Sequence, residues 1–326
     1  MDFLVNIWGV ILVLMLFIYV ALDGFDLGVG MLCLIERDQH QKSVIMHSIG
    51  GVWDANETWL VLLGGALFGA FPLAYAALLQ ALYVPILLML FSLIFRGVAF
   101  EFYLYAKRPA IWVFAFGLGS LLTAMAQGLA LGGLLGGLSL SEGGTTAVFA
   151  WLTPLSLLTA ALLIAGYCLL GSTYLLYKID GRLRESAAVW VWRSAMLLSA
   201  LLIALIIVNP LFTPYVSERW AADPFFYSIL AAGFVSAFVM MLWSVKRQRY
   251  SQPFFWCLAG LFLVLMGLVS SQYPYIIPGA MTLYEAASSA KTLEFMLYAE
   301  GGLLPVILIY NGYQYYVLRG AVSEHY

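Results

Sequence analysis

Two pairs of carboxylates with the same spacing stand beside long apolar stretches of the chain. Asp23 and Asp26 are three residues apart, and so are Asp54 and Glu57. In a helix this spacing places both members of a pair on neighbouring positions of one face. Carboxylates in a low-dielectric setting hold protons more readily than in water, and a file of them bridged by water can pass protons along. The spacing therefore predicts a proton path.

A third charged segment holds Arg96 and Glu101 at the end of the next apolar stretch. An arginine in low dielectric keeps a neighbouring carboxylate ionised, and this is the role we expect of Arg96. Charges at membrane depth cost about 2.5–3.5 kcal/mol on insertion scales, so those that occur are candidates for function. The alternative is a set of satisfied charges at helix ends. It stays open above all for Asp26 and Glu101, which lie nearest to the water.

The elements that must position these charges are membrane helices. The chain is 63% apolar and only 10% charged, against about 25% charged residues in typical soluble domains. Eight long runs contain no Asp, Glu, Lys or Arg: 3–22, 58–95, 109–141, 143–177, 194–217, 224–245, 250–284 and 301–318. A spanning helix needs about 20 predominantly apolar residues, so each run is long enough, or nearly so, to cross.

The run 58–95 is too long for one crossing and contains Pro72, which cannot donate to a helix ladder. It predicts two helices with a tight hairpin near residues 70–75. We therefore predict an all-α polytopic bundle of about nine transmembrane helices, at roughly 4–31, 47–71, 75–99, 111–137, 150–177, 190–210, 224–245, 253–275 and 297–318. The interval 276–296 is predicted to be a structured loop.

The basic residues predict the orientation of this bundle. With nine spans, thirteen of the fifteen Lys and Arg residues fall on one side, and only Arg219 and Lys291 fall on the other. By the positive-inside rule the N-terminus is periplasmic and the C-terminus cytoplasmic. The chain is predicted to be one integral membrane domain, 1–326. Its helices would form two four-helix sets, roughly 4–137 and 150–275, with a peripheral helix at 297–318.

The potential metal ligands are few and scattered. The three histidines (His40, His47 and His325) lie in loops or at a helix edge, and the three cysteines (Cys33, Cys168 and Cys257) stand far apart. A haem-binding membrane subunit needs axial ligands, usually histidine, inside its helices. We therefore predict that this chain ligates no haem or other metal and holds no catalytic residue of its own. Nothing in the sequence predicts a nucleic-acid partner.

Glycines recur every four residues in the predicted fourth span, at Gly128, Gly132 and Gly136. Small residues at this spacing let helix backbones approach closely. Two interpretations stay open: close packing within this chain, which we favour, or packing against a partner subunit.

Four segments in the first hundred residues resemble subunit II of cytochrome bd-type ubiquinol oxidases: 22–30 (LDGFDLGVG), 53–60 (WDANETWL), 70–72 (AFP) with 75–76 (YA), and 95–102 (FRGVAFEF). Shorter segments follow in order, at 273–275 (YPY), 287–289 (ASS) and 305–308 (PVIL). The resemblance covers essentially the whole chain. One departure is Ala55, where the family usually has Gly. The short length favours the cyanide-insensitive branch.

The resemblance implies a complex in the bacterial inner membrane that oxidises ubiquinol and reduces oxygen to water. It implies haem b and haem d in the partner, subunit I, and in this chain a supporting subunit with a proton path from the cytoplasm. A small accessory membrane subunit and a structural ubiquinone are further expectations. Asp54 would take up the proton and Asp23 would relay it, while Trp53 would contact a quinone or lipid. The remaining charged residues that match the pattern are Glu57, Glu101, Asp26 and Arg96.

Two other functions remain as alternatives. An ion-coupled secondary transporter would also use carboxylates inside helices, but it predicts an inverted repeat and broken helices in matched halves, and neither is visible in the sequence. A purely structural assembly subunit would pair the same charges at an interface. Mutational kinetics would separate that alternative from the proton path.

Overall fold

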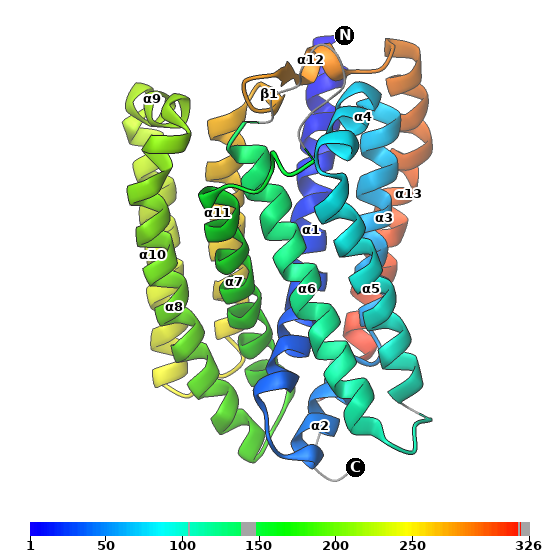
Figure 1. Ribbon diagram of the computed structural model, residues 1–326, viewed down its shortest axis with the longest axis vertical. Coiled ribbons are helices and arrows are strands. Elements are labelled where there is room, and N and C mark those ends of the chain that lie inside the picture. The colour runs from blue at the N-terminus through cyan, green and yellow to red at the C-terminus, as the bar shows by residue number, and fades with distance from the viewer. Residues whose placement is uncertain (104, 138–147, 319, 321–326) are drawn as a thin grey trace.

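The structure is a computed structural model that describes residues 1–103, 105–137, 148–318 and 320, and these form a bundle of long helices (Figure 1). Among the described residues, eight helices are long and apolar enough to cross a membrane. They are α1 (Asp2–Ile35), α5 (Tyr83–Tyr103), α6 (Pro109–Leu135), α7 (Pro154–Lys178), α8 (Arg182–Phe212), α10 (Pro224–Lys246), α11 (Pro253–Gln272) and α13 (Ala290–Val317). The predicted all-α polytopic bundle is confirmed.

The predicted count of nine spans differs from these eight at the second span, 47–71. The structure divides this stretch into the end of α2 (Gln39–Ile49) and helix α3 (Trp53–Ala70). The first turns of α3 hold Asp54, Asn56 and Glu57, so α3 is less apolar than the eight spanning helices. These polar turns are the ones that face the charged cluster described below.

The predicted break at Phe71-Pro72 is present in the structure. Helix α3 ends at Ala70, and α4 (Pro72–Ala81) begins with its proline at the first helical position, where a missing N–H costs nothing. A second break separates α4 from α5 at Leu82, three residues before Pro85. Pro85 cannot donate to the carbonyl of Ala81, which explains this break. The predicted third span, 75–99, is therefore two helices in sequence.

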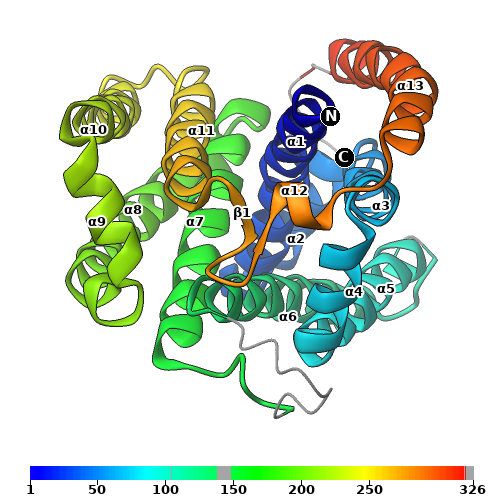
Figure 2. The same cartoon turned by 90° about the horizontal axis from the view of Figure 1, so that it is seen from above.

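Helix α1 runs through the length of the bundle and packs against α3, α6 and α7 (Figures 1 and 2). Helix α8 packs on α7, α10 packs on α11, and α13 packs on α3 at the opposite side. Helix α1 thus contacts helices from both of the four-helix sets proposed from the sequence. The division into two sets stays a prediction.

The two ends of the bundle carry different elements. At the end that holds the N-terminus lie α9 (Pro214–Ala222), the hairpin of β1 (Tyr275–Ile277) and β2 (Met281–Thr282), and α12 (Leu283–Ala286) (Figure 1). Helix α2 lies at the opposite end, here called the α2 end. At the start of α12 the N–H and hydroxyl of Thr282 donate to Glu285 Oε2 at 2.7 and 2.8 Å. These bonds lower the pKa of Glu285.

Glycines bring α6 and α7 against α1 at the level of its charges. A Cβ atom at Gly28 would lie 1.9 Å from the carbonyl oxygen of Tyr167, and a Cβ at Gly30 would lie 2.1 Å from the hydroxyl of Ser120. Glycine at these two positions lets α1 approach the backbone of α7 and the Ser120 side chain of α6 this closely. These contacts seal α1 on two sides, so the carboxylates that precede them in the sequence are buried.

We expect Gly28→Ala to destabilise the chain by about 1–3 kcal/mol, the usual cost of overpacking, because the added methyl group meets the backbone of α7 rather than a movable side chain. The measurement is the thermal midpoint of the purified complex in detergent. Gly166→Ala is the matched control, since a Cβ at Gly166 meets nothing within 4 Å. Equal midpoints for the two variants would contradict the packing described here.

Candidate functional site

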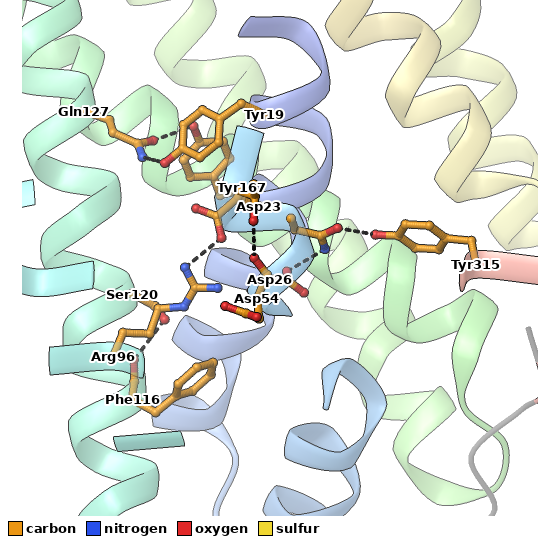
Figure 3. Close-up of polar contacts among 12 residues, drawn as sticks. Tyr19, Asp23, Asp26, Asp54, Arg96, Phe116, Ser120, Gln127, Tyr167 and Tyr315 are labelled. Atoms are coloured by element: carbon orange, nitrogen blue, oxygen red, sulfur yellow. Dashed lines mark hydrogen bonds and ion pairs between the residues drawn. The ribbon is translucent and has the colours of Figure 1, made fainter. Parts of the chain in front are cut away.

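A buried ion pair joins α1 to α5 near the middle of the bundle. Arg96 Nη1 donates to Asp23 Oδ1 at 2.7 Å, and both side chains have no exposed surface (Figure 3). The Arg96 guanidinium also lies 5.7 Å from the ring centroid of Phe116 on α6. Because a lone buried charge is strongly unfavourable, each member of this pair makes the burial of the other tolerable.

Asp26, one turn further along α1, has a neutral partner instead. Asn56 Nδ2 on α3 donates to Asp26 Oδ2 at 2.8 Å, and the hydroxyl of Tyr315 on α13 donates to Asn56 Oδ1 at 2.7 Å (Figure 3). Asp26 is also fully buried. Two consecutive hydrogen bonds thus link Asp26 on α1 to α3 and, through Asn56, to α13.

A third polar group lies on the other side of Asp23, toward the N-terminal end of the bundle. Gln127 on α6 lies between two phenols: its Nε2 donates to the Tyr19 hydroxyl, and its Oε1 accepts from the Tyr167 hydroxyl, both at 2.6 Å (Figure 3). Tyr19 precedes Asp23 by one turn on the same face of α1. Beyond Tyr19, the buried residues of α1 are apolar: Met15, Leu12, Trp8 and Val5.

Several buried polar atoms of this cluster have no hydrogen-bond partner among the described residues: Asp23 Oδ2, Asp26 Oδ1, and Arg96 Nε and Nη2. Buried polar atoms in proteins are nearly always paired, with ordered water where no protein group is available. Donors and acceptors are both present here. Bound water molecules would satisfy these atoms, and they would also bridge the charges for proton transfer.

The predicted carboxylates differ in their distance from this cluster. Asp54, at the start of α3, is exposed on the surface of this chain. Glu57, one turn later, is half-buried and interacts electrostatically with Arg96, Asp23 and Asp54. The order Asp54, Glu57 and then the buried pair of α1 carboxylates thus leads from the surface to the interior. Glu101 is exposed, and among the described contacts no hydrogen bond or ion pair joins it to the cluster.

Trp53 and the glycines of α6 lie outside the cluster. The Trp53 ring is half-buried and packs on Phe100 of α5, with 5.2 Å between ring centroids. Cβ atoms at Gly128 and Gly132 would lie 2.3 Å from the Cα atoms of Ala160 and Ser156 on α7, whereas Gly136 is exposed at the end of α6. The two buried glycines therefore pack against α7 of this chain.

A family model and several known proteins match this sequence over nearly its whole length. The family model described as cytochrome bd terminal oxidase subunit II matches residues 4–318. The chain belongs to this family. Subunit 2 of the cytochrome bd-I ubiquinol oxidase of Escherichia coli K12 is 26% identical, with 98% of this chain and 95% of that protein covered. Subunit 2 of the cytochrome bd ubiquinol oxidase of Bacillus subtilis is 25% identical, with 98% and 97% covered.

A solved structure shares the fold of this subunit II. The bd oxidase from Geobacillus thermodenitrificans matches with a TM-score of 0.83 at 22% identity, and the match covers 97% of this chain and 98% of the matched chain. Family membership selects the terminal oxidase over the secondary transporter. The chain is thus a multi-pass bacterial membrane protein and a subunit of a quinol-oxidising terminal oxidase complex, with a subunit I partner. Among its described residues, no group of three or more His, Cys, Asp or Glu side chains is placed to hold a metal ion.

The sequence interpretation missed the neutral members of the site in this subunit II. Asn56 lies between the two carboxylates of α3, and Gln127 is the one glutamine in the run 109–141, so polarity within apolar helices was the available signal. The three tyrosines had no such signal, because the chain has 20 and most of them suit membrane interfaces.

Proposed function

We propose that this chain supplies the proton path of a cytochrome bd quinol oxidase, from the cytoplasm to the oxygen-reducing haem of subunit I. The observation that carries the proposal is the graded burial of the carboxylates. Asp54 is exposed, Glu57 is half-buried, and Asp23 and Asp26 are fully buried beside Arg96. In this arrangement Asp54 takes up the proton, and the buried acidic interior beside Arg96 passes it on through bound water.

The chemistry of the complex explains why such a path is needed. Reduction of oxygen to water consumes protons, whereas oxidation of ubiquinol releases them. If protons are taken from the cytoplasm and released at the periplasmic side, turnover builds a membrane potential without a pump. The distribution of the basic residues supports an orientation in which the α2 end faces the cytoplasm, and in this proposal the membrane is the inner membrane. In this assignment haem b and haem d belong to subunit I, as the scarcity of histidine in this chain supports.

Two exposed carboxylates on the surface of this chain support a complex in which a partner subunit packs against them. Asp54 and Glu101 are exposed side chains on membrane helices, and a carboxylate facing lipid is costly. In the proposed complex subunit I shields these carboxylates from lipid, while Asp54 stays in contact with cytoplasmic water so that it can take up the proton. We include in this proposal a ubiquinone or lipid against the half-buried ring of Trp53, and a small accessory membrane subunit.

We expect Asp54→Asn to slow oxygen consumption by the purified complex on the order of ten- to a hundredfold, because a positioned proton-transfer group is lost. The haem absorbance spectrum should stay unchanged. Glu294→Gln is the matched control: it neutralises an exposed carboxylate on α13. Oxygen consumption by quinol and proton uptake by the complex in vesicles are the measurements.

A collapse of the haem spectrum in Asp54→Asn would support the second candidate function instead. In that case the charges hold the subunits together, and the chain acts only in assembly. The exposure of Asp54 and Glu101 at the chain surface is the observation that favours this candidate. Full turnover in Asp54→Asn, with an intact spectrum, would contradict the proton path.

A further inference from the structure

The two buried carboxylates of α1 have opposite electrostatic settings. Asp23 accepts a hydrogen bond from a guanidinium at 2.7 Å, whereas Asp26 accepts one from a neutral amide at 2.8 Å. Each carboxylate keeps one oxygen without a partner among the described residues: Oδ2 of Asp23 and Oδ1 of Asp26. The two carboxylates are thus equally buried, but their partners differ. The guanidinium beside Asp23 favours the ionised carboxylate, whereas the amide beside Asp26 can donate to either the ionised or the protonated form.

Protonation of Asp23 would disrupt the site. It would leave Arg96 with no anion in direct contact, and a buried cation that has lost its partner is strongly unfavourable. Arg96 has no other ion pair among the described residues, since its remaining nitrogens Nε and Nη2 are without hydrogen-bond partners there. A group that carries protons must gain and lose them readily, so Asp23 is suited to remain an anion.

Protonation of Asp26 leaves its partner satisfied. Asn56 donates to Oδ2, and an oxygen of a neutral carboxylic acid accepts such a bond as a carboxylate does. The proton then resides on Oδ1, the oxygen without a partner. The titratable groups that interact with Asp26 are Arg96 on α5, Asp23 on α1, Glu57 on α3, Tyr174 on α7 and Tyr315 on α13.

Tyr315 decides which end of the Asn56 amide faces Asp26. Its hydroxyl donates to Asn56 Oδ1, so the amide nitrogen points at Asp26 Oδ2 and the amide oxygen points away (Figure 3). With the amide reversed, two acceptor oxygens would face each other whenever Asp26 is ionised. Tyr315 therefore holds Asn56 in the one orientation that serves both charge states of Asp26, although it does not touch the carboxylate itself.

We propose that Asp26 is the proton carrier of the path, that Asn56 and Tyr315 are its positioning residues, and that Asp23 is a fixed anion paired with Arg96. This assignment rests on the proton path proposed above. In the step itself, ionised Asp26 takes a proton on Oδ1 from the side of Glu57 and Asp54. It then gives the same proton from Oδ1 to the next acceptor toward subunit I, so the group returns to its starting state.

The test is a double-mutant cycle on the whole complex with Tyr315→Phe and Asp26→Asn. We expect Asp26→Asn to lower quinol-driven oxygen consumption about ten- to a hundredfold. Tyr315→Phe should lower it about three- to tenfold, the effect that one hydrogen bond supports, and should displace the pH profile of turnover. In the Asp26→Asn background, Tyr315→Phe should have no further effect, because its role acts through Asp26. Tyr313→Phe, at an exposed position on the same helix, is the matched control.

An infrared difference spectrum distinguishes a proton carrier from a structural residue, because only a carboxylate that takes up a proton changes its absorbance during turnover. A band of a protonated carboxylic acid should change during turnover in the wild type and in Tyr313→Phe, and it should be absent in Asp26→Asn. An intact haem spectrum in every variant is required for the comparison. The inference is overturned if Asp26→Asn turns over normally, if the carboxylic acid band persists in it, or if the effects of Tyr315→Phe and Asp26→Asn multiply.

The same series separates this inference from the proton path on which it rests. Slow turnover in Asp54→Asn together with normal turnover in Asp26→Asn would overturn the assignment of Asp26 and leave the path standing. Normal turnover in Asp54→Asn and in Asp26→Asn would overturn both.

Discussion

Arg96→Met is expected to prevent accumulation of the assembled complex, with a loss of about 3–5 kcal/mol in the stability of this subunit. The substitution keeps a long apolar side chain but removes the charge that faces Asp23 at 2.7 Å. Asp23 has no exposed surface, so solvent cannot replace the guanidinium. The measurement is the amount of haem-containing complex recovered per membrane protein, together with its thermal midpoint.

The matched control removes both charges. In Arg96→Met with Asp23→Asn neither position of the former ion pair carries an unpaired charge, and the replacement of a buried ion pair by neutral groups is often close to neutral in stability. We therefore expect the double variant to recover assembly that the single variant has lost. Normal recovery of the Arg96→Met complex, or equally poor recovery of both variants, would contradict the account of the ion pair.

The helices could be predicted because a helix that crosses a bilayer needs a run of about 20 predominantly apolar residues. Apolar runs and Pro72 were sufficient for the long helices and for the break between α3 and α4. The second span did not fit this pattern, since its first turns hold Asp54, Asn56 and Glu57. Asn56 and Glu57 face other protein groups, and hydropathy alone does not carry that information. Hydropathy likewise did not predict α9 or the hairpin of β1 and β2 at the N-terminal end of the bundle.

The charged residues could be picked out from the sequence as candidates, because charge within apolar helices is costly and therefore rare. Asp23, Asp26, Glu57 and Arg96 do gather in one place. Their roles could not be separated from spacing, since Asp23 and Asp26 are one turn apart on the same helix. The difference between them comes from long-range partners, above all from Tyr315, which lies 259 residues beyond Asn56 in the sequence.

The glycines show the same limit. Their recurrence at Gly128 and Gly132 predicted close packing without naming the partner, and the structure shows α7 of the same chain. Gly28 and Gly30 were part of the segment that carries the family resemblance, yet their physical task is to let α7 and α6 close over α1. A sequence pattern indicates that helices approach closely, but only the fold shows which helices do so.

The Gln127 amide gives the second large expected effect. In Gln127→Leu, the hydroxyls of Tyr19 and Tyr167 both lose their partner at 2.6 Å within the interior of the bundle. An unsatisfied buried polar group costs about 1–3 kcal/mol, so the two together should lower the thermal midpoint of the complex more than Gly28→Ala does. The midpoint of the purified complex, with the haem spectrum as a check on assembly, is the measurement.

The control for Gln127→Leu is the triple variant Gln127→Leu, Tyr19→Phe and Tyr167→Phe, which removes all three polar partners at once. Apolar groups of the same shape leave no unpaired donor or acceptor, so most of the lost stability should return. Turnover should not return to the same extent, because the Tyr19 hydroxyl also interacts with Asp23 and is lost in the triple variant. A triple variant as unstable as the single one would show that shape, and not hydrogen bonding, governs this part of the interior.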